Sequence, residues 1–144
     1  MGRSLWRHRL IVVDSSAVVA IQLGEPSAEA LLQRLRIEGA ALMSAANYVE
    51  SGQVLAQRHP RSVTEALAQF HDTLELANIA IAPIDEAQAR AALEARIKYG
   101  RGFGHQARLN YGDCFAYALA KVRDLPLLYV GDDFTHTDIV SALA

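Results

Sequence analysis

The order of apolar and polar residues along the chain predicts short strands that alternate with helices. Uninterrupted apolar runs occupy residues 10–13, 40–43, 79–81 and 127–130. A short apolar run that is rich in β-branched residues is typical of a strand buried on both faces. Between these runs, apolar residues recur three and four positions apart, which is the spacing of an amphipathic helix. The pattern predicts an α/β fold with a central parallel sheet of about four to five strands, flanked by helices.

Residues suited to cap or stop a helix mark where the helices begin and end. Ser44, Ser62 and Asp85 each precede a helical pattern, and Gly24 and Gly39 each follow one. The helix expected over residues 111–123 is apolar on nearly every side, which is typical of a buried helix. We expect helices over residues 17–23, 27–38, 45–57, 63–77, 86–98 and 111–123, and a short helix after the last strand.

Length and composition indicate a single globular domain. The chain has 144 residues, of which 51% are apolar and 21% charged, with a net charge of −2. A chain of this length folds around one core. We expect a basic extension over residues 1–9 and the domain over residues 10–144. No apolar run approaches the roughly 18 residues of a membrane span. The single Cys114 cannot form an internal disulfide, which favours a reducing compartment such as the cytoplasm.

Acidic residues follow the first and last predicted strands, lie about two turns into the helix after the second strand, and begin the buried helix; a parallel sheet would bring them to one edge. They are Asp14, Glu50, Asp113, Asp132 and Asp133. Ionised carboxylates a few ångströms apart repel one another, so some must bind protons or share a divalent cation. Mg²⁺ and Mn²⁺ prefer oxygen ligands and suit phosphate substrates, whereas the chain has no Cys or His spacing suited to zinc. A metal-assisted reaction on a phosphate ester is therefore one function that the pattern allows.

Each acid also has a purely structural interpretation, and residue spacing alone leaves both interpretations open. Asp14 suits a turn or a helix cap, and the pair Asp132 and Asp133 suits an Asx turn. Asp113 would interact favourably with the dipole of the helix it begins. Glu50 would be an ordinary solvated residue on a helix surface.

Four segments that contain these acids occur in the order and structural context of a known family. They are residues 11–17, 43–50, 109–120 and 128–134, with Thr137 and Asp138 after the last. With these segments the chain resembles the PIN-domain ribonucleases and, within them, the VapC toxins of bacterial toxin–antitoxin pairs. Two features depart from the family pattern: Gly131 stands where many members have Thr or Ser, and nine residues precede the first strand.

The resemblance implies a single PIN-like domain with Mg²⁺- or Mn²⁺-dependent endoribonuclease activity, acting as the toxin of a toxin–antitoxin pair. It implies that Asp14 and Asp113 hold the principal metal ion and that Glu50 and Asp133 complete the acidic pocket. Asp133 aligns with the fourth acid of the family, so Asp132 is given only a supporting position. The resemblance also implies a homodimer and a VapB-like antitoxin that blocks the site.

Two hydroxyl residues follow Asp14 and are the expected supports of the acidic pocket. Ser15 and Ser16 are placed to hydrogen-bond a ligand carboxylate, which would fix its orientation. A plain helix cap is an equally good interpretation of either hydroxyl.

A basic, glycine-containing segment before Asp113 is the expected contact for RNA. Its cations are Arg96, Lys98, Arg101 and Arg108, and such side chains neutralise phosphates. The aromatic residues of this region, which suit stacking on bases, are Tyr99, Phe103 and Tyr111. A solvated loop with ordinary surface charge is the alternative interpretation.

Three other functions fit part of the pattern. A receiver-type signalling domain also gathers aspartates around Mg²⁺, but it needs a lysine after the last strand, and none is present. A HAD-like phosphatase needs Asp-x-Asp after the first strand, whereas this chain has Asp14-Ser15-Ser16. A catalytically idle binding module of the same fold is disfavoured because every acidic position is filled.

Overall fold

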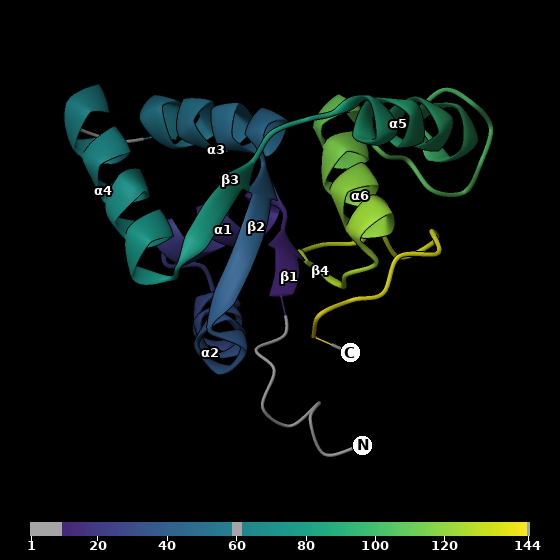
Figure 1. Ribbon diagram of the computed structural model, residues 1–144. Helices are drawn as coiled ribbons and strands as arrows, with labels where there is room; N and C mark the ends of the chain where they lie inside the picture. Colours follow the sequence, from purple (N-terminus) through teal and green to yellow (C-terminus); the bar gives the residue numbers. More distant parts are fainter. Residues whose placement is uncertain (1–9, 59–61, 144) are drawn as a thin grey trace, which may run out of the picture.

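A parallel sheet of four strands forms the centre of the computed structural model, which describes residues 10–58 and 62–143 (Figure 1). The predicted extension over residues 1–9 lies outside the described residues. The strand order is β3-β2-β1-β4, and every paired neighbour is parallel, which confirms the predicted fold class. The strands are β1 (Leu10–Val13), β2 (Ala40–Ser44), β3 (Ile79–Ala82) and β4 (Leu127–Leu128).

Six helices connect and flank the strands in the described part of the chain, and their bounds lie close to the predicted ones. Ser62 and Asp85 cap their helices as expected, because each side chain accepts a hydrogen bond from a backbone N–H three residues later. The first helix begins at Ser15 instead of residue 17, because Asp14 caps it. The helices are α1 (Ser15–Gln22), α2 (Ala28–Glu38), α3 (Ala45–Arg58), α4 (Val63–Leu76), α5 (Glu86–Tyr99) and α6 (Tyr111–Arg123).

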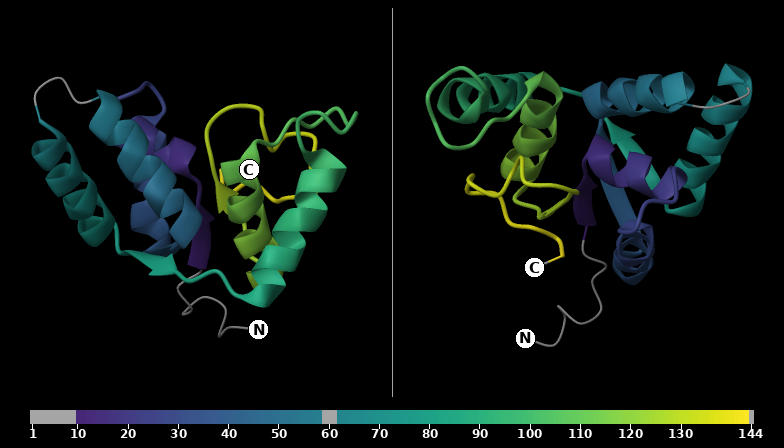
Figure 2. Two further views of the ribbon diagram at one scale, coloured as in Figure 1. Left: turned by 90° about the horizontal axis from the view of Figure 1, so that it is seen from above. Right: turned by 180° about the vertical axis from the view of Figure 1, so that it is seen from behind.

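The central strand β1 contributes to two hydrophobic cores, one on each face of the sheet. Ile11 and Val13 pack into the core beneath α1, α2 and α4, whereas Val12 packs into the core beneath α5 and α6. Alternate residues of a strand point to opposite faces, so an unbroken apolar run is what a strand covered on both sides requires. The two groups of helices are seen on either side of the central strands in Figure 2.

The carboxyl ends of β1 and β2 lie at one edge of the sheet, where three helices begin. The parallel register pairs Val12 with Leu42, so the two strands end side by side. Helix α1 begins directly after β1, and α3 begins directly after β2. The start of α6 is joined to the start of α3 by a 3.0 Å hydrogen bond from Asn47 Nδ2 to the Gly112 carbonyl. This edge is where open parallel sheets bind their ligands.

The segment after β4 differs from the prediction. The strand contains only Leu127 and Leu128, and residues 129–143 form turns where we expected a short helix. Gly131 adopts a φ of +94°, which is incompatible with a continuing strand or helix. The chain then returns alongside β4, where Leu127 donates to the Val140 carbonyl at 2.8 Å. Because its backbone groups pair with β4 in this way, the final segment does not coil into a helix.

Asp138 fastens this final segment to α6. Its carboxylate accepts hydrogen bonds from Tyr117 Oη at 2.5 Å and from Lys121 Nζ at 2.9 Å. Burial acts to raise the pKa of Asp138, but the two hydrogen bonds act more strongly, so the pKa lies below its usual value. The contribution of Asp138 to stability is therefore present at neutral pH and is lost as the pH falls through its lowered pKa.

We expect Asp138→Ala to lower the Tm and to speed amide hydrogen exchange in residues 129–143, because the carboxylate that binds the segment to α6 is gone. The decrease in Tm should be present at pH 7 and smaller below the usual carboxyl pKa. The control is Asp72→Ala on the exposed surface of α4. Equal exchange rates in Asp138→Ala and the unmodified protein would contradict the assignment.

Candidate functional site

Asp14 lies at the end of β1 with one carboxylate oxygen engaged and the other unpartnered. The side chain is 3% exposed. Its Oδ2 accepts a 3.0 Å hydrogen bond from the Ser16 N–H and thereby caps α1. Its Oδ1 is buried and has no hydrogen-bond partner among the described residues. Helix capping therefore occupies one oxygen only, and the other remains available to a ligand.

Asp113 lies in the first turn of α6, where a reciprocal pair of hydrogen bonds fixes it. Its Oδ2 accepts from the Asn110 N–H at 2.9 Å, and the Asn110 Oδ1 accepts from the Asp113 N–H at 2.8 Å. This capping box holds the carboxylate at the positive end of the helix dipole. The side chain is 5% exposed, so it is almost as buried as Asp14.

The two buried aspartates repel each other, and both pKa values are raised. Burial, with a smaller contribution from the charge of Glu50, raises the pKa of Asp14 to about 6. Burial, followed by the charges of Asp14 and Asp133, raises the pKa of Asp113 to about 8. The tertiary structure thus brings together four acids that are far apart in the sequence, as the parallel topology predicts.

Glu50 is held against the start of α6 by two side chains. Its Oε1 accepts hydrogen bonds from Ser15 Oγ at 2.5 Å and from Asn47 Nδ2 at 3.2 Å. The carboxylate packs directly on Gly112, where a Cβ would lie 2.2 Å from Glu50 Oε2. The sequence interpretation did not include Asn47 or Gly112 among the functional residues. The spacing of Asn47 three residues before Glu50, on the same face of a helix, is the signal that identifies it.

Asp132 and Asp133 are both exposed in the turns after β4. Asp133 is close enough to Asp113 for its charge to raise the pKa of Asp113. Ser16 supports this region from the other side, because its Oγ accepts a 3.0 Å hydrogen bond from the Val130 N–H. Of the two serines, Ser15 therefore contacts an acid through its hydroxyl, and Ser16 fixes the chain that leads to Asp133.

The arrangement of Asp14 and Asp113 fits a hard divalent cation. An unpartnered, buried carboxylate oxygen and a second buried carboxylate beside it are oxygen donors whose mutual repulsion a cation would relieve. Within residues 10–58 and 62–143, no three Asp, Glu, His or Cys side chains form a ready-made metal site. Water ligands would therefore complete the coordination, as is usual for Mg²⁺. Cys114 is unsuited as a ligand because burial raises its pKa to about 11.

The four predicted RNA-binding cations have different surroundings. Arg96 is half-buried, and its guanidinium donates to the carbonyls of Leu109 and Arg101 at 3.2 and 3.4 Å, so it holds the loop together. Lys98 is exposed and lies over the ring of Tyr99. Arg101 and Arg108 are exposed, and no described residue forms an ion pair or hydrogen bond with the guanidinium group of either one. These two are the cations most available to a phosphate.

One of the three aromatic residues near the loop is buried, and the other two are exposed. Tyr99 is only 4% exposed and packs against Tyr117 and His105, so the expectation that it stacks on a base is wrong. Phe103 and Tyr111 are exposed. Tyr111 also lines a groove of about 260 Å³ between α5 and α6 that includes Cys114, the neighbour of Asp113.

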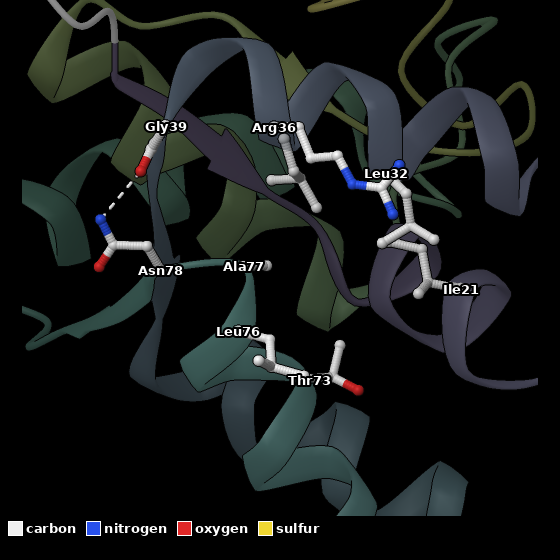
Figure 3. Close-up of a pocket in the computed structure, with 9 residues that line it drawn as sticks. Ile21, Leu32, Arg36, Gly39, Thr73, Leu76, Ala77 and Asn78 are labelled. Carbon is white, nitrogen blue, oxygen red and sulfur yellow. Dashed lines mark hydrogen bonds between the residues drawn. The ribbon is translucent and has the colours of Figure 1, made fainter.

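A second groove lies away from the acids. It has a volume of about 380 Å³ and is formed by α1, α2 and the end of α4 (Figure 3). It includes Ile21, at the opposite end of α1 from Asp14, and Arg36 points into the same region. The acidic site is therefore defined by its carboxylates and not by this groove.

Among the described helices, none is long and apolar enough to cross a membrane.

Sequence comparison finds the same family that the motifs indicate. The model of the family described as PIN domain matches residues 11–140. Ribonuclease VapC42 of Mycobacterium tuberculosis is 44% identical over 129 residues, which are 90% of this chain and 96% of that protein. Ribonuclease VapC28 of the same organism is 41% identical over 133 residues, which are 92% of this chain and 98% of that protein.

Comparison with solved structures shows that they share the fold. The VapC20 toxin of Mycobacterium tuberculosis, described as cleaving the sarcin–ricin loop, has a TM-score of 0.69 and 13% identity, covering 90% of this chain and 96% of that chain. A toxin–antitoxin complex from Klebsiella pneumoniae has a TM-score of 0.67 and 17% identity, covering 93% of this chain and 98% of that chain. At these identities the likeness concerns architecture alone.

We expect the metal-free protein to lose stability as the pH rises from about 4 through 8. Asp113 ionises near 3.8 when unfolded and near 8 when folded, so rising pH removes protons from the unfolded state first and favours it. Asp113→Asn keeps the capping oxygen and removes the charge, so its Tm in chelator should exceed that of the unmodified protein at pH 8.

The control for this prediction is Asp85→Asn, which changes an acidic helix cap outside the pair and should keep the original pH dependence. Thermal unfolding in chelator at pH 5, 6, 7 and 8 measures the effect. Identical pH profiles for Asp113→Asn and the unmodified protein would show that the pKa of Asp113 is not raised in the folded state.

Proposed function

The chain belongs to the PIN-domain family, and on that basis we propose that it is a VapC-type ribonuclease toxin that hydrolyses RNA phosphodiester bonds. The observation that carries the proposal is the buried pair Asp14 and Asp113, with an unpartnered oxygen on Asp14. Charged groups are rarely buried in pairs of like sign unless they have a function. The two relatives compared above, each more than 40% identical, are named as ribonucleases.

The proposal includes dependence on Mg²⁺ or Mn²⁺, held by Asp14 and Asp113. When bound, such a cation stabilises charge on the phosphoryl oxygens and lowers the pKa of water. Glu50 belongs to the acidic pocket in this proposal, and the hydrogen bonds from Ser15 and Asn47 to its Oε1 fix the carboxylate beside the start of α6. Asp133 completes the acidic pocket, supported by its effect on the pKa of Asp113, and Asp132 is assigned no direct part.

RNA binding is assigned to the loop between α5 and α6. Arg101 and Arg108 present unpaired cations, which can bring the phosphate backbone toward carboxylates that would otherwise repel it. Lys98 adds an exposed charge at the end of α5, and Arg96 keeps the loop in shape. Phe103 and Tyr111 offer exposed rings for stacking.

The proposed partners follow from the family. We propose that a cognate VapB-like antitoxin blocks the site and that the toxin forms a homodimer. The fold is shared with chains of a toxin–antitoxin complex. We place the activity in the cytoplasm, where Cys114, a free and buried thiol, would remain reduced.

A catalytically idle binding module of the same fold is the remaining alternative function. Family membership removes the receiver-type and HAD-like alternatives, but an idle member would share the architecture. Substitution at the acids separates the two functions, because an idle module would have no RNA cleavage to lose.

We expect Asp14→Asn and Asp113→Asn each to reduce RNA cleavage by about 100-fold or more, because each removes a charge on which transition-state stabilisation depends. Chelator should have the same effect on the unmodified protein. The assay uses purified protein freed of any partner, structured RNA, and Mg²⁺ or Mn²⁺. The matched control is Asp132→Asn, an exposed acid beside the site, which should retain cleavage. Unchanged cleavage by Asp14→Asn would contradict the mechanism.

We expect the double variant Arg101→Ala and Arg108→Ala to bind RNA more weakly, because both cations are exposed and unpaired within the described structure. The slope of the logarithm of affinity against that of salt concentration should fall by about 1 for each phosphate that the variant no longer neutralises. Arg90→Ala with Arg123→Ala removes the same charge from other parts of α5 and α6 and serves as the control. Equal slopes for the two double variants would show that the loop is an ordinary solvated surface and does not contact RNA phosphates.

A further inference from the structure

Asn47 connects two helices of the acidic site through one amide group. The residue is 0% exposed, although it lies in the first turn of α3. Its Nδ2 donates to Glu50 Oε1 at 3.2 Å and to the Gly112 carbonyl at 3.0 Å. The first bond stays within α3, whereas the second crosses to the start of α6. One side chain therefore links the carboxylate of Glu50 to the turn that carries Asp113.

Ser15 adds a third helix to this connection. Its hydroxyl lies 2.5 Å from Glu50 Oε1, to which it donates, and 3.2 Å from the backbone carbonyl of Asn47. Since Ser15 is the first residue of α1, directly after Asp14, the contact fixes Glu50 relative to the end of β1 as well. The starts of α1, α3 and α6 thus meet around one carboxylate.

Gly112 makes this meeting possible because it has no side chain. A Cβ at this position would lie 2.2 Å from Oε2 and 2.7 Å from Cδ of Glu50. The carboxylate therefore lies directly on the first turn of α6, where the positive end of the helix dipole favours a negative charge. Any larger residue at position 112 would displace the Glu50 carboxylate from this position.

Packing alone does not explain why a polar side chain occupies position 47, because an apolar side chain would fill the space without burying an unpaired polar atom. Its Oδ1 is buried and has no hydrogen-bond partner in the described part of the chain. Leaving a buried polar atom unpaired costs about 1–3 kcal/mol. The two hydrogen bonds that Nδ2 donates offset this cost. We therefore take the bonds to Glu50 and Gly112 as the contribution of Asn47.

We propose that Asn47 is a positioning residue, which with Ser15 and Gly112 forms a seat that fixes the Glu50 carboxylate relative to Asp113 and Asp14. The inference rests on the proposed function, because it takes Glu50 to belong to the metal-dependent site. Asn47 itself does not contact substrate in this assignment. It acts by holding Glu50 Oε1 through one hydrogen bond and by holding the start of α6 against α3 through the other.

The test compares Asn47→Leu with Gly112→Ala, which disturb the seat from opposite sides. Leucine keeps the branch point at Cγ, is larger than asparagine, and removes the donor. Alanine at position 112 favours the helix and displaces only the flexible end of Glu50, so the fold is retained. The control is Ser51→Ala on the same helix, because Ser51 is also fully buried and its Oγ has no partner among the described residues.

Two measurements separate positioning from ordinary stability. The first is the Mn²⁺ concentration that gives half of the maximal rise in Tm, and the second is kcat and KM for cleavage of a structured RNA. In both seat variants we expect the Mn²⁺ midpoint to rise about 10-fold and kcat to fall about 10- to 100-fold, with KM nearly unchanged. Ser51→Ala should change only the metal-free Tm.

Each outcome decides a particular claim. An unchanged Mn²⁺ midpoint and kcat in Gly112→Ala would overturn the proposed seat, even if Asn47→Leu failed to fold. Equal losses in Ser51→Ala would also overturn it, because they would show a general effect of disturbing α3. A protein whose Mn²⁺ response depends on Asn47 and Gly112 but which cuts no RNA would retain the seat and refute the proposed function.

Discussion

Repulsion between buried carboxylates is the constraint on which this site depends. Asp14 and Asp113 are nearly inaccessible to water, burial raises the cost of ionising both, and the charge of Asp14 raises it further for Asp113. Helix starts offset part of that cost, because each carboxylate accepts a backbone N–H at the positive end of a helix dipole. The capping interactions therefore do not compete with a ligand role. They hold the charges in place while the unpartnered Oδ1 of Asp14 remains available.

The parallel sheet positions the acids, and the loop before α6 presents the exposed cations. Parallel register brings the ends of β1 and β2 together, which places α1 and α3 side by side at the same edge. Helix α6 joins them through Asn47 and Gly112. The exposed cations belong to the loop that leads into α6, so the segment proposed to bind RNA continues directly into the turn that carries Asp113. Rigid elements thus hold the charges, while an irregular segment presents the contacts.

Much of this arrangement was predictable from local sequence. The four apolar runs, the caps at Ser62 and Asp85, and the acids at strand and helix ends reflect short-range preferences that neighbouring residues express by themselves. The final segment was predicted wrongly as a helix, because its backbone pairs with β4, more than ten residues earlier in the chain. The burial of Tyr99 was missed for a similar reason, since Tyr117 and His105 cover it from other elements.

The amino-acid sequence was sufficient to predict the α/β class and the order of the elements, because periodicity and capping are properties of short stretches of chain. The three-dimensional structure was needed to show that Asp14 and Asp133 lie close enough to Asp113 to raise its pKa, and that Arg96 is engaged within the loop. It also revealed the seat formed by Asn47 and Gly112. These features depend on distances between residues remote in sequence, and packing sets those distances.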